Sequence, residues 1–450
     1  MQVWDRQGAR NRQQGLVGRL MGLLALALAI LACGAPPPPE MIPVATLEPS
    51  VAPFRVVSLA GNMLQSRTGR DGKLQWEAHI GSVGPALLTP DAGAHVVYVS
   101  ASSAPMVTAV SASTGRILWQ FSRCTGPDTT ILLGQGRVYL TCGQTAEAGP
   151  DAIALATMYA LDAQTGAVLW TAAQQHARTI ADANVITQTT TGLAALNGAT
   201  GAVLWRRQVD IGPQGTVPPL DAFDFVVRVG PGGLYYSPDG IYAEALQISS
   251  GALLWRSGPL RDPASAPNST FIQHASVALA TADEIVTQGI YGVTVLRTSD
   301  GTALWRHYQY PDGGGATMLV GDDGTVYVAN YSGPPLVTPD PMGASQPLAA
   351  LNPRDGSLRW EAPGPVAFHP LVFLSGDTLF TGEPSAFDTT NGARRWRQPY
   401  LHADYLAANA SVLCLQEGPL LYALKVADGL KVWKQTLSAS GRASPLLLPA

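Results

Sequence analysis

Charge is the property in which this sequence is poorest. Charged residues make up 13% of its 450 positions, which is about half of the usual share in a globular protein. The 28 basic and 32 acidic residues are scattered along the chain, and the lysines and arginines form no run. Binding to nucleic acid relies on a basic patch or stripe. The sequence therefore argues against a nucleic-acid partner.

Residues that hold metals or attack substrates are also scarce. The four cysteines include no adjacent pair and no Cys-x-x-Cys, and the seven histidines show no metal-ligand spacing. Neither a Gly-x-Ser-x-Gly elbow nor a phosphate-binding loop occurs. The acidic run GDDG at 321–324 lacks the later glutamate of a calcium loop, so we interpret it as a tight hairpin turn. The sequence predicts no metal site and no catalytic residue.

No apolar run is long enough to cross a bilayer comfortably. The run from Leu20 to Ala32 is broken only by Gly22, follows four arginines, and is followed at once by Cys33. A basic segment before a short apolar run is typical of a secretory signal, and the residues around Cys33 resemble a bacterial lipobox. We therefore predict a signal peptide at residues 1–32 and lipid attachment to Cys33. Ordinary cleavage nearby, which would release a soluble protein, is the alternative.

The segment after Cys33 is rich in proline. Residues 36–39 are all proline, and three more prolines follow before residue 54. Such a composition favours an extended, semi-rigid spacer over a folded domain. We predict a tether at residues 33–54, which holds a folded domain at residues 55–450 a short way from the membrane.

What the sequence has in abundance is one repeat, whose clearest copy is MYALDAQTGAVLW at 158–170. A glycine lies four residues before the tryptophan in every copy, and Thr, Ser, Asp or Asn precedes that glycine. Alanine lies ten residues before the tryptophan in seven copies. The nine copies end at Trp76, Trp119, Trp170, Trp205, Trp255, Trp305, Trp360, Trp396 and Trp433.

Each position of the repeat has a physical reason. The residues before the turn alternate between apolar and polar, which predicts a short strand. Thr165 and Gly166 then reverse the chain, because glycine adopts positive φ without a steric penalty. A second strand ends at Trp170, whose large ring can fill the space between neighbouring sheets while its N–H finds an acceptor. We therefore expect the tryptophans to be structural.

The spacing and the motif together indicate the fold. Successive tryptophans lie 35 to 55 residues apart, which leaves room for about four strands per unit and is typical of a propeller. The motif A-x-D/N-x-x-T/D-G-x-x-x-W resembles the tryptophan-docking motif of pyrroloquinoline-quinone-type (PQQ-like) β-propellers, and the resemblance covers residues 55–450. It implies an all-β propeller of four-stranded antiparallel blades, in which the nine tryptophans form a structural girdle.

The blade count depends on the two ends of this domain. Eight units fit between residues 77 and 433, and eight is the usual number in the family that the motif resembles. We interpret the end pieces, residues 55–76 and 444–450, as partial blades that meet where the ring closes. We predict eight blades, and a ninth formed by joining the end pieces is the alternative.

The resemblance is compatible with an enzyme. PQQ-dependent dehydrogenases of this fold commonly hold the cofactor between an aromatic ring and a disulfide of adjacent cysteines, beside calcium. This sequence has no adjacent cysteines, and its only tryptophan outside the girdle is Trp4, in the predicted signal. We therefore expect neither bound PQQ nor catalysis. A PQQ-dependent dehydrogenase or a small-molecule-sensing propeller is the alternative function.

The favoured function is a non-catalytic protein-binding scaffold. In its anchor, size and repeat the chain resembles the outer-membrane assembly factor BamB family. That resemblance implies an exported protein of the bacterial cell envelope, lipid-anchored to a membrane on its periplasmic or extracellular face. It also implies that the partners are other envelope proteins, in outer-membrane or envelope protein assembly.

Long segments interrupt the compact repeat at 144–156, 206–222, 256–270 and 331–346. In a propeller, the connections between the second and third strands of a blade lie on the same face as the connections between blades. The turns between the first and second strands, and between the third and fourth, lie on the other face. Segments 144–156 and 331–346 are of the former type and segments 206–222 and 256–270 join blades, so all four lie on the same face. Because long loops on a rigid scaffold are where binding usually occurs, we expect the partner on this face.

A few isolated residues complete the candidates. His274 and His369 each precede a predicted innermost strand, which places them near the mouth of the central channel, although a lone histidine more often has a packing role. Cys124 and Cys142 flank a predicted hairpin and either pair in an oxidising compartment or stay free. Cys414 lies in an apolar run and is expected to be a buried thiol.

Overall fold

The structure is a computed structural model that describes most of residues 45–450. Residues 1–44 lie outside the described part, and with them the predicted signal peptide, Cys33 and the start of the tether. Within the described part no helix is long and apolar enough to cross a membrane. The segments between residues 45 and 450 that are not described are 82–85, 102–106, 124–130, 144–155, 210–225, 239–241, 261–275, 290–291, 309–316, 330–347, 364–371, 382–383, 399–400, 402 and 442.

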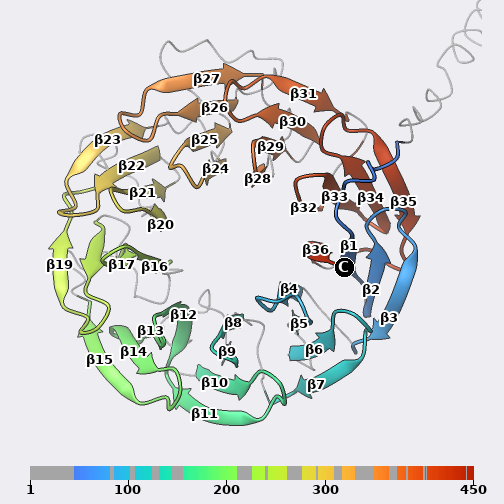
Figure 1. Ribbon diagram of the computed structural model, residues 1–450. Coiled ribbons are helices and arrows are strands. Elements are labelled where there is room, and N and C mark those ends of the chain that lie inside the picture. Colours follow the sequence, from blue (N-terminus) through green and yellow to red (C-terminus); the bar gives the residue numbers. More distant parts are fainter. Residues whose placement is uncertain are drawn as a thin grey trace, which may run out of the picture. The chain divides into compact units, whose positions relative to one another are not determined.

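The described strands form nine sheets of four antiparallel strands, arranged around a central axis as the blades of a propeller (Figure 1). Each blade is given below from its innermost to its outermost strand. Blades 1 to 3 contain β36 (Leu446–Pro449), β1 (Phe54–Ala60), β2 (Met63–Thr68) and β3 (Leu74–His79); β4 (Ala86–Pro90), β5 (Val96–Ala101), β6 (Val107–Ser111) and β7 (Ile117–Phe121); and β8 (Ile131–Gly134), β9 (Arg137–Cys142), β10 (Thr157–Asp162) and β11 (Val168–Ala173).

Blades 4 to 6 lie opposite blade 1 in the ring. They contain β12 (His176–Ala181), β13 (Asn184–Thr189), β14 (Gly192–Asn197) and β15 (Val203–Gln208); β16 (Arg228–Gly230), β17 (Gly233–Tyr236), β18 (Glu244–Leu246) and β19 (Leu253–Arg256); and β20 (Ser276–Ala280), β21 (Glu284–Gly289), β22 (Gly292–Arg297) and β23 (Ala303–Tyr308).

Blades 7 to 9 complete the ring. They contain β24 (Thr317–Val320), β25 (Val326–Ala329), β26 (Leu348–Leu351) and β27 (Leu358–Ala362); β28 (Val372–Ser375), β29 (Thr378–Thr381), β30 (Ser385–Asp388) and β31 (Arg394–Arg397); and β32 (Tyr405–Ala408), β33 (Val412–Glu417), β34 (Leu420–Lys425) and β35 (Lys431–Thr436).

The blade count corrects the sequence prediction. Eight blades were predicted, whereas the described strands form nine, because the two end pieces combine into one complete blade. The C-terminal strand β36 pairs antiparallel with β1, placing Phe54 opposite Pro449 and Val57 opposite Leu446. Unpaired strand edges invite association with other chains. The pairing of the two chain ends closes the ring (Figure 1).

The two outer strands of each blade share one irregularity. In blade 4, Ala195 lies directly opposite Trp205, but the next pair is Leu196 with Val203, so Leu204 is the extra residue of a β-bulge. The same register shift occurs in the outer hairpin of every described blade. The bulge twists the outermost strand, which turns the tryptophan toward the neighbouring blade and the residues before it toward solvent.

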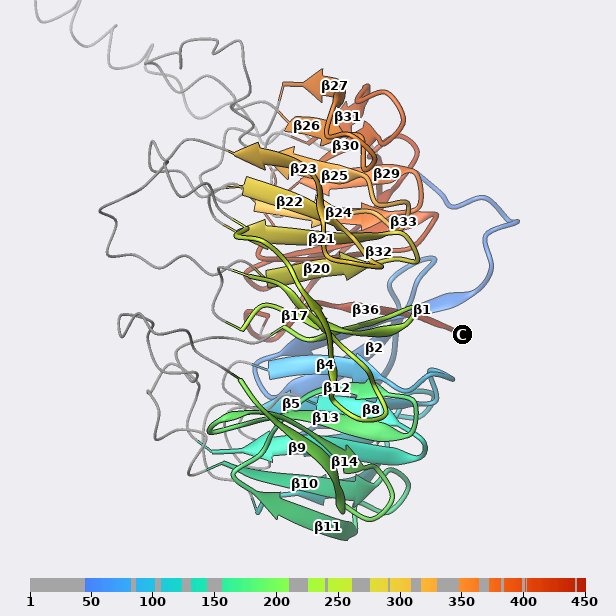
Figure 2. The same ribbon diagram turned by 90° about the vertical axis from the view of Figure 1, so that its left-hand side faces the viewer.

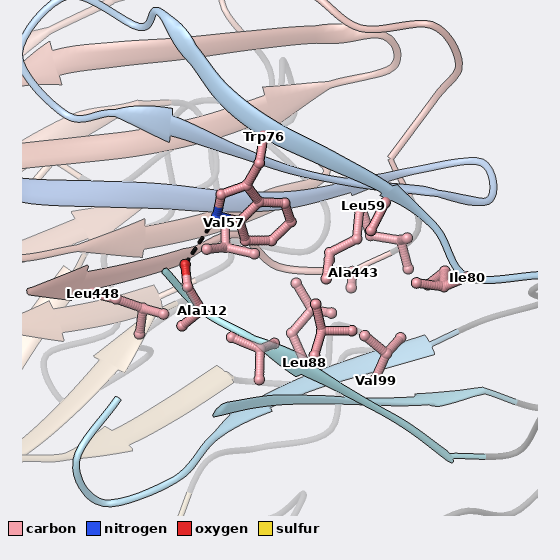
Figure 3. Close-up of a cluster of buried hydrophobic side chains, with 13 residues drawn as sticks. Val57, Leu59, Trp76, Ile80, Leu88, Val99, Ala112, Ala443 and Leu448 are labelled. Atoms are coloured by element: carbon pink, nitrogen blue, oxygen red, sulfur yellow. Dashed lines mark hydrogen bonds between the residues drawn. The ribbon is translucent and has the colours of Figure 1, made fainter. Parts of the chain in front are cut away.

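The core is divided among the seams between adjacent blades. In the first seam, Val57, Leu59 and Trp76 of blade 1 pack against Leu88 and Val99 of blade 2 (Figure 3). Full burial of an aliphatic side chain of this size contributes about 1.5–3 kcal/mol. The ring therefore depends on repeated seams of similar composition and has no single central core.

The end of the predicted tether packs against the propeller. The Ala45 N–H donates to the Lys431 carbonyl over 2.8 Å, and Leu47 is buried in the seam between blades 9 and 1. The Glu48 carboxylate pairs with the Lys425 ammonium at 3.4 Å. Residues from Ala45 onward thus form one compact unit with the blades.

Candidate functional site

The tryptophans join each blade to the next. The indole N–H of each one donates to a backbone carbonyl of the following blade, and the last bond, from Trp433, crosses the closure to blade 1. The donors and acceptors are Trp76 and Ala112 (3.0 Å), Trp119 and Ala163 (3.0 Å), Trp170 and Gly198 (3.1 Å), Trp205 and Ile248 (2.9 Å), Trp255 and Thr298 (2.8 Å), Trp305 and Pro353, Trp360 and Thr389 (2.9 Å), Trp396 and Val426 (2.7 Å), and Trp433 and Gly69 (2.8 Å).

The turn glycine of the motif receives the indole ring of the preceding blade. Gly201 has φ 73°, and a Cβ added there would lie 2.7 Å from Cδ2 of Trp170. Asn197 shapes the same turn, since its Oδ1 accepts hydrogen bonds from the backbone N–H groups of Ala199 and Thr200, both at 3.0 Å. The motif glycine is required both for its backbone conformation and for the space that the ring occupies.

The two faces of the ring differ in their connections. The strands run between the two faces of the ring (Figure 2). On one face lie the connections between blades and also the connections between the second and third strands of each blade, such as β9 to β10, β13 to β14 and β25 to β26. We call this the long-connection face and the opposite one the tight-turn face. The strand ends that flank all four long segments lie on the long-connection face.

Several predicted features of this face lie outside the described residues. These are His274, His369 and the larger part of all four long segments. Two of the segments begin later than expected, because β15 continues to Gln208 and β19 to Arg256. The structure therefore assigns the first residues of these two segments to outer strands.

A buried ionic cluster joins blades 4 and 5 beneath the long-connection face. Glu244, at the start of β18, is fully buried. Its carboxylate accepts from the Arg256 guanidinium at 2.6 Å, from the Arg207 guanidinium of blade 4 at 3.2 Å, and from the Tyr236 hydroxyl. We refer to these four residues as the Glu244 cluster. It connects the ends of β15 and β19, where two of the long segments begin.

The Glu244 cluster has a structural role. Burial, followed by the Glu244 charge, raises the pKa of the Tyr236 hydroxyl, so that it stays a neutral donor. Both Glu244 oxygens are held by protein groups, and the carboxylate has no solvent-accessible surface. Glu244 is therefore placed to hold two blades in register and has no free oxygen to offer to a substrate.

The sequence contains a signal for this cluster that lies outside the repeat pattern. Glu244 lies eleven residues before Trp255, and no other copy of the motif has a charged residue at that position. A charge facing a neighbouring blade requires a partner there. Arg207, two residues after the preceding motif tryptophan, supplies it.

The described cysteines differ in state. Cys142 is disulfide-bonded, and its partner lies outside the described residues, as does Cys124. Cys414 is a free thiol in the seam between blades 9 and 1. Complete burial raises the pKa of the Cys414 thiol, which keeps it protonated and unreactive.

The described residues supply no obvious place for calcium or PQQ. No group of three or more His, Cys, Asp or Glu within the described ranges is arranged around a possible metal ion. Asp323 in the 321–324 run instead accepts from the N–H and hydroxyl of Thr325, at 3.0 and 2.7 Å, in a hairpin turn. The turn glycine of the next blade lies against each girdle indole, so these rings are used to join blades.

Comparison with solved structures shows the propeller fold. The computationally designed protein Ika8 matches with a TM-score of 0.52 and 12% identity, over 79% of this chain and 98% of that one. BamB from Moraxella catarrhalis matches with a TM-score of 0.44 and 15% identity, over 69% and 88%. The quinohemoprotein alcohol dehydrogenase ADHIIG from Pseudomonas putida HK5 gives 0.43 and 13%, over 78% and 66%. No curated protein matches the chain in sequence.

The family comparison covers nearly the whole propeller. The profile described as outer membrane protein assembly factor BamB matches residues 60–222, 194–370 and 380–448. These ranges include the tryptophan-docking motif of every blade. The chain therefore belongs to the BamB family of PQQ-repeat β-propellers.

Proposed function

We propose that this protein is a non-catalytic scaffold that binds other proteins of the bacterial cell envelope, in outer-membrane or envelope protein assembly. Family membership supports the proposal, since the family is described by outer membrane protein assembly. The structural observation that carries the proposal is that the indole rings join the blades. All nine motif tryptophans are hydrogen-bonded across seams, so the recurring tryptophans build the ring and are not available to a substrate.

The proposed location is the bacterial cell envelope, with the chain anchored to a membrane on its periplasmic or extracellular face. A signal peptide at residues 1–32, lipid on Cys33 and the proline-rich tether would together export and anchor the chain. The disulfide at Cys142 supports this location, because disulfides persist in oxidising compartments. Cytoplasmic proteins, in contrast, are usually kept reduced.

The proposed binding face is the long-connection face. Rigid rings tolerate loop changes at little thermodynamic cost, so the four long segments can vary without loss of the fold. The hairpin turns of the other face are occupied by internal hydrogen bonds, as at Asn197. The partner would therefore be recognised by the connections and not by the turns.

Loop replacement tests this function. Residues 331–346 and 211–222 are each replaced by a short Gly-Ser turn, which leaves β15 and the Glu244 cluster intact. Both forms are used as affinity baits in detergent-solubilised envelopes of the source bacterium. We expect the wild type to retain specific envelope proteins, the shortened form to lose them, and the two melting temperatures to agree closely.

A matched control alters the opposite face. Gln164→Arg and Ala199→Arg change two exposed turn residues on the tight-turn face, and this variant should capture the same proteins as the wild type. Equal capture by wild type and shortened form would reject the long-connection face as the binding face. PQQ-dependent dye reduction by the protein loaded with PQQ and calcium would instead favour the enzyme alternative.

A further inference from the structure

We propose that the outermost strands of blades 4, 5 and 6 form a docking surface for an amphipathic helix that carries acidic residues along one flank. The strands are β15, β19 and β23, which follow one another along the rim (Figure 1). The inference rests on the proposed protein-binding function. It uses a surface made by the blades themselves and requires none of the long segments.

The first observation is an exposed row of apolar side chains. Val203 and Leu204 of blade 4, and Leu253 and Leu254 of blade 5, are 43% to 51% exposed. Leu304 continues the row on blade 6, at 36%. Single exposed leucines are common, but the outermost strands of two successive blades each expose an apolar pair, which offers apolar area for a partner to bury.

The β-bulge explains why these side chains face solvent. The tryptophan of each outer strand turns into the seam, so the residue directly before it points the opposite way. The bulge adds one residue at this point, which brings the second residue of the pair to the exposed side as well. The exposure of both positions is therefore a consequence of tryptophan docking, whereas their apolar character is particular to these blades.

The second observation is a parallel row of arginines. Arg206, Arg256 and Arg306 each follow the tryptophan directly and are exposed. Each lies two residues after its blade's leucine, which places the two side chains on the same side of the strand about 7 Å apart. The rim of these three blades thus presents a line of apolar groups beside a line of guanidinium groups.

Among the described residues of this surface, positive charges outnumber negative ones. Of the described acidic residues, only Glu244 pairs with this surface, where it contacts Arg256 and Arg207. The outer turns of blades 4 and 5, residues 197–201 and 247–251, contain no charged residue. An acidic flank on a partner would therefore find complementary charge here.

The other blades show that this combination is local. Leu74 of blade 1 and Leu358 of blade 7 are as exposed as the leucines of the row, at 45% and 47%. The residues after their tryptophans, however, are Glu77 and Glu361. On blades 8 and 9 the positions before the tryptophan carry Arg394 with Arg395 and Lys431 with Val432.

The two parallel rows fit a helix. A helix with its side chains is about 10–12 Å wide, so its apolar face can cover the leucine row while one flank reaches the arginine row about 7 Å away. Two of the three guanidiniums are oriented by the protein, Arg256 by Glu244 and Arg306 by the Pro259 carbonyl at 2.9 Å. Oriented guanidiniums suit carboxylates at defined positions, which favours a polypeptide over the diffuse charge of a membrane.

Two synthetic peptides provide the direct test on the full-length protein. Both have about 18 residues, or about 27 Å as a helix, with leucines at i, i+3, i+4 and i+7. One carries glutamates on the flank and the other carries lysines. Fluorescence anisotropy at physiological salt should show saturable binding of the glutamate peptide, and at least about tenfold weaker binding of the lysine peptide.

Variants locate the binding on the rim. Leu204→Ser with Leu254→Ser should weaken the glutamate peptide about tenfold, as should Arg206→Glu with Arg306→Glu, which leaves the Glu244 cluster untouched. The matched control, Leu74→Ser with Leu358→Ser, removes equally exposed leucines and should bind like the wild type. All of these side chains are on the surface, so each variant should keep the wild-type melting temperature.

Three results would overturn the proposal. They are equal binding of both peptides, equal loss in the control variant, and binding of phosphatidylglycerol vesicles through the same residues when neither peptide binds. The form with shortened 331–346 and 211–222 segments separates this inference from the proposed function. It should still bind the glutamate peptide, even if the envelope capture experiment gives a negative result.

Discussion

At the scale of single residues, the turn glycine of one blade and the tryptophan of the preceding blade act as a unit. The indole lies where a Cβ would be, and its N–H donates to the carbonyl three residues before that glycine in the same turn, as with Trp170 and Gly198. This explains why the glycine recurs in every copy of the motif. A turn with positive φ alone also accepts asparagine, whereas a turn that receives an aromatic ring does not.

The separate contributions of φ and of the ring can be measured. Gly201→Ala should lower the free energy of unfolding by about 3 kcal/mol, since it combines left-handed backbone strain with overpacking against Trp170. Gly136 has a similar φ of 71°, and a Cβ there would meet nothing within 4 Å. Gly136→Ala should therefore cost only about 1 kcal/mol. Chemical denaturation of both variants checks the difference, and equal losses would mean that the ring contact is unimportant.

Much of this residue-level design could be predicted from the repeat. The hairpin and its turn glycine follow from local sequence, because they involve residues close together in the chain, and the size of the tryptophan predicts that it packs between blades. Glu244 was missed for the opposite reason. Its partner Arg207 lies in another blade, and the repeat indicates that blades touch without indicating which side chains meet.

At the scale of elements, the Glu244 cluster adds ionic contacts to the seam between blades 4 and 5, which the Trp205 hydrogen bond and buried apolar side chains also join. Strands β16 and β18 of blade 5 have only three residues each, so this blade has fewer ladder hydrogen bonds than its neighbours. The cluster adds charge-assisted bonds between blades 4 and 5. We infer that it compensates for the short strands.

Removal of the buried charge should be costly. Glu244→Gln leaves Arg207 and Arg256 without their counter-charge and should destabilise the protein by about 3 kcal/mol. This is the lower end of the range for a broken buried ion pair, because both arginines keep partial access to water. Thermal denaturation, monitored by circular dichroism, gives the effect.

An exposed pair serves as the comparison. Glu48→Gln makes the same chemical change in an ion pair with Lys425, where the Glu48 side chain is mostly exposed, and should cost less than about 1 kcal/mol. If both substitutions cost equally little, the cluster has no role in holding blades 4 and 5 together.

At the scale of the whole molecule, the ring is closed by the pairing of the two chain ends. The sequence did not distinguish eight blades from nine, because the contact between β1 and β36 joins residues at opposite ends of the domain. Each end piece alone looks like a fragment of a blade. Only the pairing of Phe54 with Pro449, and of the strands that follow, makes them one blade.

Truncation tests the closure. A chain that ends after Ala443 lacks β36, leaves the edge of β1 unpaired and removes Leu448 from the first seam. We expect a lower melting temperature and concentration-dependent association, because unpaired strand edges associate. Removal of Ala450 alone is the control: it loses only the hydrogen bond from the Ala450 N–H to the Pro53 carbonyl, leaves β36 in place and should change both properties much less. A truncated protein that stays monomeric with wild-type stability would contradict the closure.

The N-terminal prediction concerns how the molecule is anchored. Cys33→Ser should abolish acylation and the processing that accompanies it, so the protein should leave the membrane fraction or remain as its precursor. Mass spectrometry of the mature N-terminus and membrane fractionation check this. A wild-type protein that carries no lipid on Cys33 would show that ordinary signal cleavage releases it.

Site-specific photo-crosslinking in the source cells tests the central claim, that this ring binds envelope proteins through its long-connection face, most directly. A photoreactive residue is placed at Leu336 or Thr216, within the long segments, and at Gln164 or Ala199 on the tight-turn face. If this claim holds, we expect crosslinks to the same envelope protein from the first two positions and none from the other two. The absence of crosslinks from the long segments, or equal crosslinking from both faces, would contradict it.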